Sequence, residues 1–317
     1  MRLVYYELNS RIPDELEPLV AAIGFFDGLH KGHQKLVDET VNQAHKQGLK
    51  PALITFSPSP GAVLTGEDEK LLTTVSERAK KAKEFGVEVM IVLRFSKELS
   101  QLDPNVFYNQ IIKKLNIKYI VCGEDFRYGY RGSGNVDTLK KIEDLGLSVV
   151  EDYNYNNERV SSTRIKNELA QGRVDTVKDL LGYSYELNGY VMHGRKKGRT
   201  IGFPTLNVSV EKSKILPIDG VYIGVSVIQE KNYVSTINIG HNPTINTVTQ
   251  KSIESFVHNY DQDTYGQKVT LKLLKRIRDE EKFNSVDELI TQMNKDIIAT
   301  ETYFDEKQRR LFNIETI

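Results

Sequence analysis

Residues 24–33 carry the run Gly24-Phe25-Phe26-Asp27-Gly28-Leu29-His30-Lys31-Gly32-His33, directly after an apolar segment at residues 19–23. A strand ending at Ile23 would lead into a glycine-rich turn, where missing Cβ atoms let backbone N–H groups approach phosphate oxygens. The following helix would point its partially positive N-terminus at the same place. Because His30 and His33 are three residues apart, both would project from one face of the first helical turn.

Two imidazoles at this turn indicate a reaction in which negative charge develops on phosphate oxygens. They can donate hydrogen bonds to those oxygens, which suits nucleotidyl transfer. The alternative is a simple turn with two solvated histidines. The run has neither the G-x-G-x-x-G spacing of a dinucleotide-binding turn nor the Gly-Lys-Ser/Thr of a P-loop, so hydride transfer and P-loop hydrolysis are disfavoured.

Composition favours a two-domain globular enzyme. The chain of 317 residues is longer than a domain with one average hydrophobic core. Its 39% hydrophobic and 27% charged residues are ordinary for a globular protein. The 43 acidic and 43 basic side chains cancel, so no global field indicates nucleic acid or a membrane as partner. Cys122 is the sole cysteine, residues 1–11 lack signal-peptide order, and no apolar stretch approaches the roughly 20 residues that span a bilayer. We therefore expect a soluble, cytoplasmic protein.

The first half of the chain alternates strand-like and helix-like patterns. Short apolar runs predict buried parallel strands at residues 51–56, 87–93, 117–122 and 147–151. Helical periodicity lies between them, at residues 31–47, 75–85 and 104–115. This alternation predicts an α/β, doubly wound parallel sheet, in which ligands bind beyond the carboxyl ends of the strands. The turn at residues 24–33 would emerge at that edge.

After residue 183 the pattern changes to strands separated by Gly, Pro, Asn and Asp turns. The predicted strands are residues 185–193, 221–229, 233–240, 252–260 and 268–277. Few helices intervene, so we expect a small antiparallel β-barrel followed by a C-terminal helix over residues 285–303. Two short helices separated by Gly172 are expected between the halves. The predicted domains are residues 1–182 and 183–317.

Three motifs of the first half resemble those of the bacterial riboflavin kinase/FAD synthetase family. The run at residues 24–33 is similar to its G-x-F-D-G-x-H-x-G-H signature, within the nucleotidylyltransferase superfamily. Residues 123–129, Gly-Glu-Asp-Phe-Arg-Tyr-Gly, are similar to its second nucleotide-site motif. Residues 161–164, Ser-Ser-Thr-Arg, place hydroxyl groups at a predicted helix N-terminus beside an arginine, whose planar donors suit phosphate.

The resemblance implies that a Rossmann-like nucleotidylyltransferase domain adenylylates FMN to FAD. It implies catalytic roles for His30, His33 and Arg164. The implied nucleotide- or flavin-binding residues belong to the three motifs: Gly24, Phe26, Asp27, Gly28, Gly32, Gly123, Asp125, Phe126, Ser162 and Thr163. The chain departs from the family at Ser57 and Ser59, where members commonly carry an acidic residue and a histidine. Whether both activities are retained is therefore open.

The second half resembles a flavokinase domain. Residues 194–207 are similar to the signature G-x-x-x-G-R-x-x-G-[FY]-P-T-x-N, in which Thr205 and Asn207 offer hard oxygen ligands for Mg²⁺. The implied nucleotide- or flavin-binding residues of this motif are Gly194, Gly198, Arg199, Gly202 and Pro204. Period-two alternation places Glu254 on one face with Phe256 and His258. The resemblance makes Glu254 the candidate general base for the ribityl hydroxyl of riboflavin.

The resemblance covers nearly the full chain and implies a bifunctional enzyme that makes FMN and then FAD. Both steps would use ATP and Mg²⁺, and the second would release pyrophosphate. The expected partners are small-molecule substrates, with no nucleic acid and no membrane, and the oligomeric state is open. Two alternatives remain: a monofunctional FMN adenylyltransferase with an inactive barrel, and a flavin-sensing regulatory protein.

Overall fold

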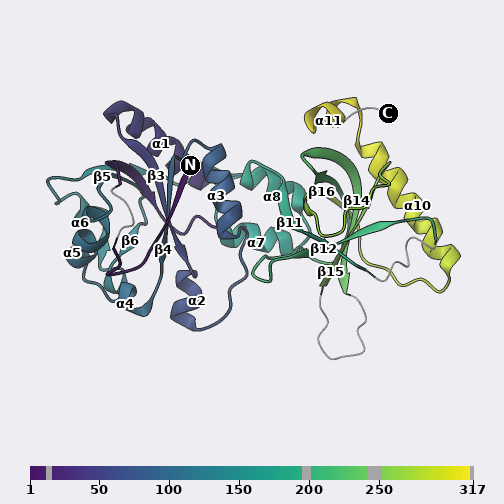
Figure 1. Cartoon of the computed structure of the whole chain (residues 1–317), viewed down its shortest axis with the longest axis horizontal. Coiled ribbons are helices and arrows are strands. Elements are labelled where there is room, and N and C mark those ends of the chain that lie inside the picture. The colour runs from purple at the N-terminus through teal and green to yellow at the C-terminus, as the bar shows by residue number, and fades with distance from the viewer. Residues whose placement is uncertain (12–15, 195–200, 242–250, 315–317) are drawn as a thin grey trace. The chain divides into compact units, whose positions relative to one another are not determined.

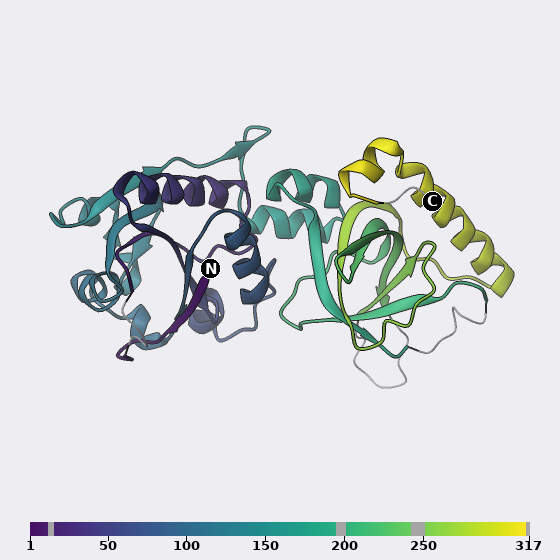
Figure 2. The ribbon, with the colours of Figure 1, turned by 45° about the horizontal axis from the view of Figure 1, so that its top comes forward.

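The computed structural model of the chain describes residues 1–11, 16–194, 201–241 and 251–314. The contacts within it divide the chain into two units, Met1–Ser162 and Thr163–Ile317 (Figure 1). In the first unit strands and helices alternate, and in the second unit strands close into a barrel (Figure 2). None of the helices in these ranges is long and apolar enough to cross a membrane.

The first unit is built on a parallel sheet of six strands in the order β1-β4-β3-β2-β5-β8. The strands are β1 Arg2–Tyr6, β2 Leu19–Ile23, β3 Lys50–Ser57, β4 Val89–Arg94, β5 Ile117–Gly123 and β8 Gly146–Val150. The sheet confirms the predicted α/β architecture. β1 was not among the predicted strands, because it lies at the edge of the sheet and exposes Leu3 and Tyr5.

Helices cover both faces of this sheet. They are α1 Lys31–Gln47, α2 Pro60–Thr65, α3 Val75–Glu84, α4 Lys97–Ser100, α5 Pro104–Phe107, the π-helix η1 Tyr108–Lys113, the 3-10 helix η2 Tyr130–Gly132 and α6 Val136–Leu139. Alternate residues of β2 belong to two separate core clusters: Val20 packs with residues of α1 and α3, and Ala21 packs with residues of η1. The central strand is thus buried on both sides, as a doubly wound sheet requires. Two short hairpins complete the unit: β6 Arg127–Tyr128 with β7 Gly134–Asn135, and β9 Asn154–Tyr155 with β10 Glu158–Arg159.

The second unit is a closed antiparallel barrel with the strand order β11-β12-β15-β14-β13-β16. Its elements are α7 Ser162–Ala170, α8 Val174–Leu181, β11 Tyr185–Met192, β12 Thr205–Val210, β13 Gly220–Ile228, β14 Lys231–His241, β15 Lys251–Val257, β16 Lys268–Arg278, α10 Val286–Tyr303 and α11 Glu306–Leu311. The predicted barrel and C-terminal helix are confirmed. β12 was not predicted, since it directly follows the glycine- and proline-containing part of the flavokinase-like motif.

Helices α7 and α8 pack against the barrel. The backbone N–H of Ile218 donates to the carbonyl of Leu169 at 3.1 Å, and α8 contacts β11 and β16. Gly172, with φ +74°, separates the two helices as expected. The division between the two structural units therefore falls after Ser162. The predicted domain boundary after Gly182 concerns where the two activities separate, and it stays a prediction.

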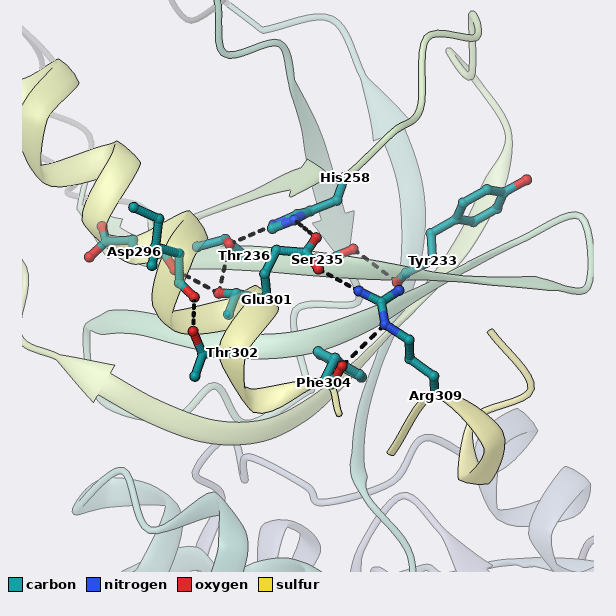
Figure 3. Close-up of polar contacts among 11 residues, drawn as sticks. Tyr233, Ser235, Thr236, His258, Asp296, Glu301, Thr302, Phe304 and Arg309 are labelled. Atoms are coloured by element: carbon teal, nitrogen blue, oxygen red, sulfur yellow. Dashed lines mark hydrogen bonds and ion pairs between the residues drawn. The ribbon is translucent and has the colours of Figure 1, made fainter. Parts of the chain in front are cut away.

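Helix α10 is held on the outer face of the barrel by polar contacts (Figure 3). Thr236 on β14 bonds the Nε2 atom of His258 and the hydroxyl of Thr300, both at 2.9 Å. The Nδ1 atom of His258 lies 2.6 Å from Glu301, which also pairs with Arg309 of α11. His258 directly follows β15, so this network fixes one end of the strand that carries Glu254.

Candidate active sites

The glycine-rich turn joins β2 to α1 and is held by two buried hydrophobic anchors. Phe26, Gly28 and Leu29 have φ values of 55°, 84° and 38°, a left-handed backbone that favours glycine. Phe26 is 1% exposed and Leu29 is fully buried, and both belong to one core cluster of the sheet. Burial thus fixes an unfavourable backbone conformation. The position of Phe26 indicates a packing role. Its ring and the His33 ring meet edge to face, with centroids 5.1 Å apart.

Asp27 ties the turn to a second loop. Its carboxylate accepts hydrogen bonds from the backbone N–H of Leu72 at 3.1 Å and of Thr73 at 2.9 Å. The backbone N–H of Gly28 donates to the Thr73 hydroxyl at 2.9 Å, and the Ser162 hydroxyl donates to the Asp27 carbonyl at 2.8 Å. Asp27 and Ser162, both predicted to bind nucleotide or flavin, therefore have their polar atoms engaged in shaping the turn.

His30 and His33 lie together at the N-terminus of α1, as the spacing predicts. Their rings stack with centroids 3.6 Å apart, and the Nδ1 atom of His30 accepts a hydrogen bond from the His33 backbone at 3.3 Å. The proton of neutral His30 is therefore on Nε2. Gly32 leaves room for the His30 ring, which would lie 3.2 Å from a Cβ atom at that position.

Both histidines are neutral near pH 7. Burial lowers the pKa of His30 to about 4, and the Arg159 charge acts in the same direction. Burial holds the pKa of His33 well below its usual range, and the charges of His30, Arg78 and Arg159 lower it further. His33 as a whole is half-buried, but its Nδ1 atom is buried and has no hydrogen-bond partner among the described residues. A neutral imidazole can still donate one hydrogen bond to a phosphate oxygen.

The second motif follows β5 at the same edge of the sheet. Gly123 begins a tight turn in which the backbone N–H of Phe126 donates to the Gly123 carbonyl at 3.1 Å. The exposed carboxylate of Asp125 pairs with Arg159 at 2.6 Å, and Phe126 stacks on Tyr128 with centroids 5.8 Å apart. Arg159 thus links this motif electrostatically to the histidines. The sequence analysis missed Arg159, which lies only two residues before the Ser161–Arg164 segment.

The third motif spans the division between the units. Ser162 ends the first unit, and Thr163 and Arg164 follow at the start of the second, where Thr163 is exposed and Arg164 is half-buried. Their binding and catalytic roles stay predictions.

Ser59, one of the two residues that depart from the family pattern, caps a short helix. The Ser59 hydroxyl caps α2 by accepting from the backbone N–H of Ala62 at 3.0 Å, and it bonds Glu69 at 2.5 Å. Ser57 is the last residue of β3, where it pairs with Arg94. Ser59 therefore serves as a helix cap.

The barrel site lies on the outer face of three neighbouring strands. Asn207 on β12 and Asn238 on β14 both stand directly opposite Glu254 on β15. The Thr205 hydroxyl donates to the Glu254 carboxylate at 3.1 Å. Glu254 is half-buried, while its neighbour Ser255 is fully buried on the other face, which confirms the predicted alternation. Sequence reasoning gave Asn238 no role, because only the strand register brings it beside Glu254.

Gly194, the first residue of the flavokinase-like motif, lies beside Asn207. A Cβ atom on Gly194 would overlap the Asn207 amide, so a larger residue there would displace this side chain. Gly202 has φ +88° and is exposed, as is Pro204. The predicted residues Gly198 and Arg199 lie outside the described residues.

The donor set of the barrel site fits Mg²⁺. A hydroxyl, an amide oxygen and a carboxylate are hard oxygen donors, which Mg²⁺ prefers together with water and phosphate. Over the described ranges, no group of three His, Cys, Asp or Glu side chains is arranged to hold a metal ion. Thr205 and Asn207 would supply two protein ligands, and Mg²⁺ usually completes its coordination with water and substrate phosphates.

The parallel sheet carries a glycine-rich turn suited to phosphate, and the barrel carries a carboxylate beside a hydroxyl and an amide. Together they define a two-domain, nucleotide-dependent transferase. The FAD synthetase family model matches residues 12–164, and the riboflavin kinase family model matches residues 181–304. The chain belongs to the family of bifunctional riboflavin kinases/FMN adenylyltransferases.

Relatives match over most of their length. The bifunctional riboflavin kinase/FMN adenylyltransferase of Listeria monocytogenes is 35% identical over 289 residues, which cover 90% of this chain and 92% of the relative. The Bacillus subtilis protein of the same name is 36% identical over 304 residues, 94% and 96% of the two chains. A crystal structure from Streptococcus pneumoniae, described as a macrolide-efflux protein, is 32% identical with a TM-score of 0.86 and covers 95% of this chain and 99% of its own.

Proposed function

We propose that the barrel phosphorylates riboflavin to FMN with ATP, and that the first unit adenylylates FMN to FAD with ATP and releases pyrophosphate. The observation that supports the proposal is that one chain contains both groups of side chains. Thr205 bonds Glu254 and Asn207 stands opposite it, and His30 stacks on His33 at a helix N-terminus. An inactive barrel, as in the monofunctional alternative, has no support in these residues.

In the kinase step, Glu254 would accept the proton of the ribityl hydroxyl as its oxygen forms a bond to the γ-phosphorus of ATP. The bond from that phosphorus to the ADP oxygen breaks. The hydrogen bond from Thr205 at 3.1 Å orients the carboxylate toward the reacting hydroxyl. Thr205 and Asn207 would hold Mg²⁺, whose charge offsets the charge of the phosphates.

In the adenylyl step, an FMN phosphate oxygen would attack the α-phosphorus of ATP, and pyrophosphate would leave. His30 and His33 would donate hydrogen bonds to the oxygens that gain charge, with the N-terminus of α1 adding its dipole. Both imidazoles are neutral in the free protein, and each keeps one N–H that can donate to a phosphate oxygen. Arg164 and Thr163 would bind phosphate, and Gly123, Asp125 and Phe126 would line the adenosine or flavin site.

The remaining expectations follow the same proposal. ATP and Mg²⁺ are co-substrate and cofactor of both steps, small molecules are the partners, and the protein acts in the cytoplasm. Equal numbers of acidic and basic side chains support the absence of a nucleic-acid partner.

The test is separate measurement of FMN and FAD formed by the purified chain from riboflavin, ATP and Mg²⁺. We expect both products, and neither when EDTA removes the cation. FMN without FAD would show that adenylylation is lost, with Ser57 as the residue to restore first. FAD from supplied FMN, but no FMN from riboflavin, would establish the monofunctional enzyme. Binding of FMN without either product would establish a flavin sensor.

A further inference from the structure

Arg78 on α3 is the largest fully buried side chain of the described residues, and neither proposed step uses it. A guanidinium stays charged at any physiological pH, and a buried charge costs free energy unless polar groups surround it. In the sequence, Arg78 belongs to a lysine-rich helix, where a charged side chain is usually solvated. Its burial therefore requires a reason.

The contacts of Arg78 converge on the turn between β2 and α1. Its guanidinium donates to the Thr55 hydroxyl at 2.5 Å and to the Thr73 carbonyl at 3.3 Å, and it lies 4.7 Å from the ring centroid of Phe25. The Thr55 hydroxyl in turn donates to the Phe25 carbonyl at 2.7 Å. Thr73 is the residue whose N–H and hydroxyl bind the Asp27 carboxylate. Arg78 thus joins the beginning of the turn to its clamp at Asp27.

We propose that Arg78 is a positioning residue for adenylyl transfer, because its planar guanidinium holds residues 25–28 in the conformation that aims His33 and the α1 N-terminus at the substrate phosphates. The proposal rests on the proposed adenylyl-transfer function of this site. The geometry needs a fork, since the two bonds and the aromatic contact lie in different directions around one planar group. An ammonium supplies the charge without that fork.

The buried charge has a second consequence for His33. The Arg78 guanidinium is one of three neighbouring cationic or ionisable groups, with His30 and Arg159, that lower the pKa of His33. It therefore helps to keep His33 neutral before substrate binds, and it adds positive potential to a site for a polyphosphate. Burial is the largest cause of the lowered pKa of His33, so removing the Arg78 charge would raise that pKa only in part, whereas removing only the hydrogen-bond relay would leave the charge in place.

The test compares Arg78→Met, Arg78→Lys and Thr55→Val in the full chain, with Lys81→Met as the matched control. Lys81 lies on the same helix, is also buried, and pairs with Glu84 at 3.0 Å. FAD synthesis from supplied FMN is measured as kcat and KM for ATP, with riboflavin kinase activity as an internal reference. We expect Arg78→Met to lower kcat for FAD synthesis about 10- to 100-fold, since a misplacement of about 1 Å can cost that much.

The other variants separate position from charge. Arg78→Lys should recover part of the rate, and Thr55→Val should lower kcat several-fold with a normal His33 titration. Only Arg78→Met should move the acid limb of the pH profile to higher pH. If Arg78→Met unfolds the first unit, Arg78→Lys and Thr55→Val carry the test. The proposal would be overturned if Arg78→Lys and Thr55→Val had the kcat and pH profile of the wild type. It would also be overturned if Arg78→Met lowered kcat no more than Lys81→Met does. If the unmodified chain makes no FAD, the proposed function fails as well.

Discussion

The two sites of this molecule are built in opposite ways. The histidine pair proposed for adenylyl transfer is contiguous: a single turn of ten residues supplies both histidines and the helix N-terminus. The proposed kinase site is assembled across strands, and Thr205 lies 49 residues from the Glu254 that it contacts. Burial also differs, because His30 is almost fully buried whereas Glu254 is half-buried. A contiguous site depends on local backbone conformation, whereas a cross-strand site depends on register.

The largest expected effect comes from separating the two regions. Residues 163–317 expressed alone should make FMN and no FAD, because this segment includes the barrel with α7 and α8. Residues 183–317 lack both helices, so the barrel surface that packs against Val177 and Leu180 would be exposed. Burial of each of these side chains stabilises the folded state by about 1.5–3 kcal/mol. We expect the shorter segment to unfold at a lower temperature. Equal melting temperatures and FMN rates for the two segments would support a boundary after Gly182.

The next effect concerns Glu254, the proposed proton acceptor of the barrel. Glu254→Gln should keep riboflavin binding but lower the kinase rate about 10² to 10⁴-fold, because an amide has nearly the shape of a carboxylate and cannot accept the proton. Adenylylation of supplied FMN should be unchanged. Glu230→Gln, on the exposed turn between β13 and β14, is the matched control. FMN production at the wild-type rate by Glu254→Gln would leave Glu254 with a structural role only.

A smaller loss is expected when one donor is removed from the turn. His33→Ala should lower FAD synthesis about 10² to 10³-fold, or about 3 to 4 kcal/mol, while FMN synthesis persists. His45→Ala, in the exposed last turn of the same helix, should have the wild-type rate of both reactions. The assay is pyrophosphate release from ATP and FMN. If His30→Ala and His33→Ala both release pyrophosphate at the wild-type rate, the turn is not the catalytic site.

The sequence predicted the contiguous site more fully than the assembled one. Local spacing placed His30 and His33 on one face, and alternation placed Glu254 on one face with Phe256 and His258, because both depend on the geometry of one element. The clamp of Asp27 on Thr73 joins residues 46 positions apart, and no local pattern contains it. β12 was missed for a related reason: its pairing with β11 and β15 makes Thr205–Val210 a strand.

Arg78 and Arg159 show a second limit of sequence reasoning. Each sits in a segment of charged residues, where a solvated side chain is the usual outcome. Arg78 is buried by partners from two other segments, Thr55 and Thr73. Arg159 is oriented by Asp125, 34 residues earlier. A charged residue in a sequence does not reveal where its side chain points. Only the tertiary fold shows that Arg159 lowers the pKa of both histidines and that Arg78 lowers the pKa of His33.

The smallest predicted effect is a difference in acid stability between the two regions. The pKa of His30 is about 4 in the folded chain against 6.5 as its ordinary value, so the unfolded chain binds this proton first. The stability of the first unit should therefore be complete above pH 6.5 and decrease as the pH falls toward 4. At 1.36 kcal/mol for each pH unit, the loss is about 2 kcal/mol by pH 5. In the barrel, burial lowers the pKa of His258, but its contact with Glu301 opposes that shift.

We therefore expect the unfolding transition of the first unit to shift more between pH 7 and pH 5 than that of the barrel. Urea unfolding followed by FAD-synthesis and FMN-synthesis activities reports the two units separately. His30→Asn should reduce the pH dependence of the first unit, because the asparagine cannot titrate and its amide can still cap α1. The part that remains is expected from His33, whose pKa burial also lowers. His45→Asn should leave the dependence as it is, since His45 is exposed. Equal pH dependence in the wild type and His30→Asn would contradict a contribution of His30 to the acid sensitivity.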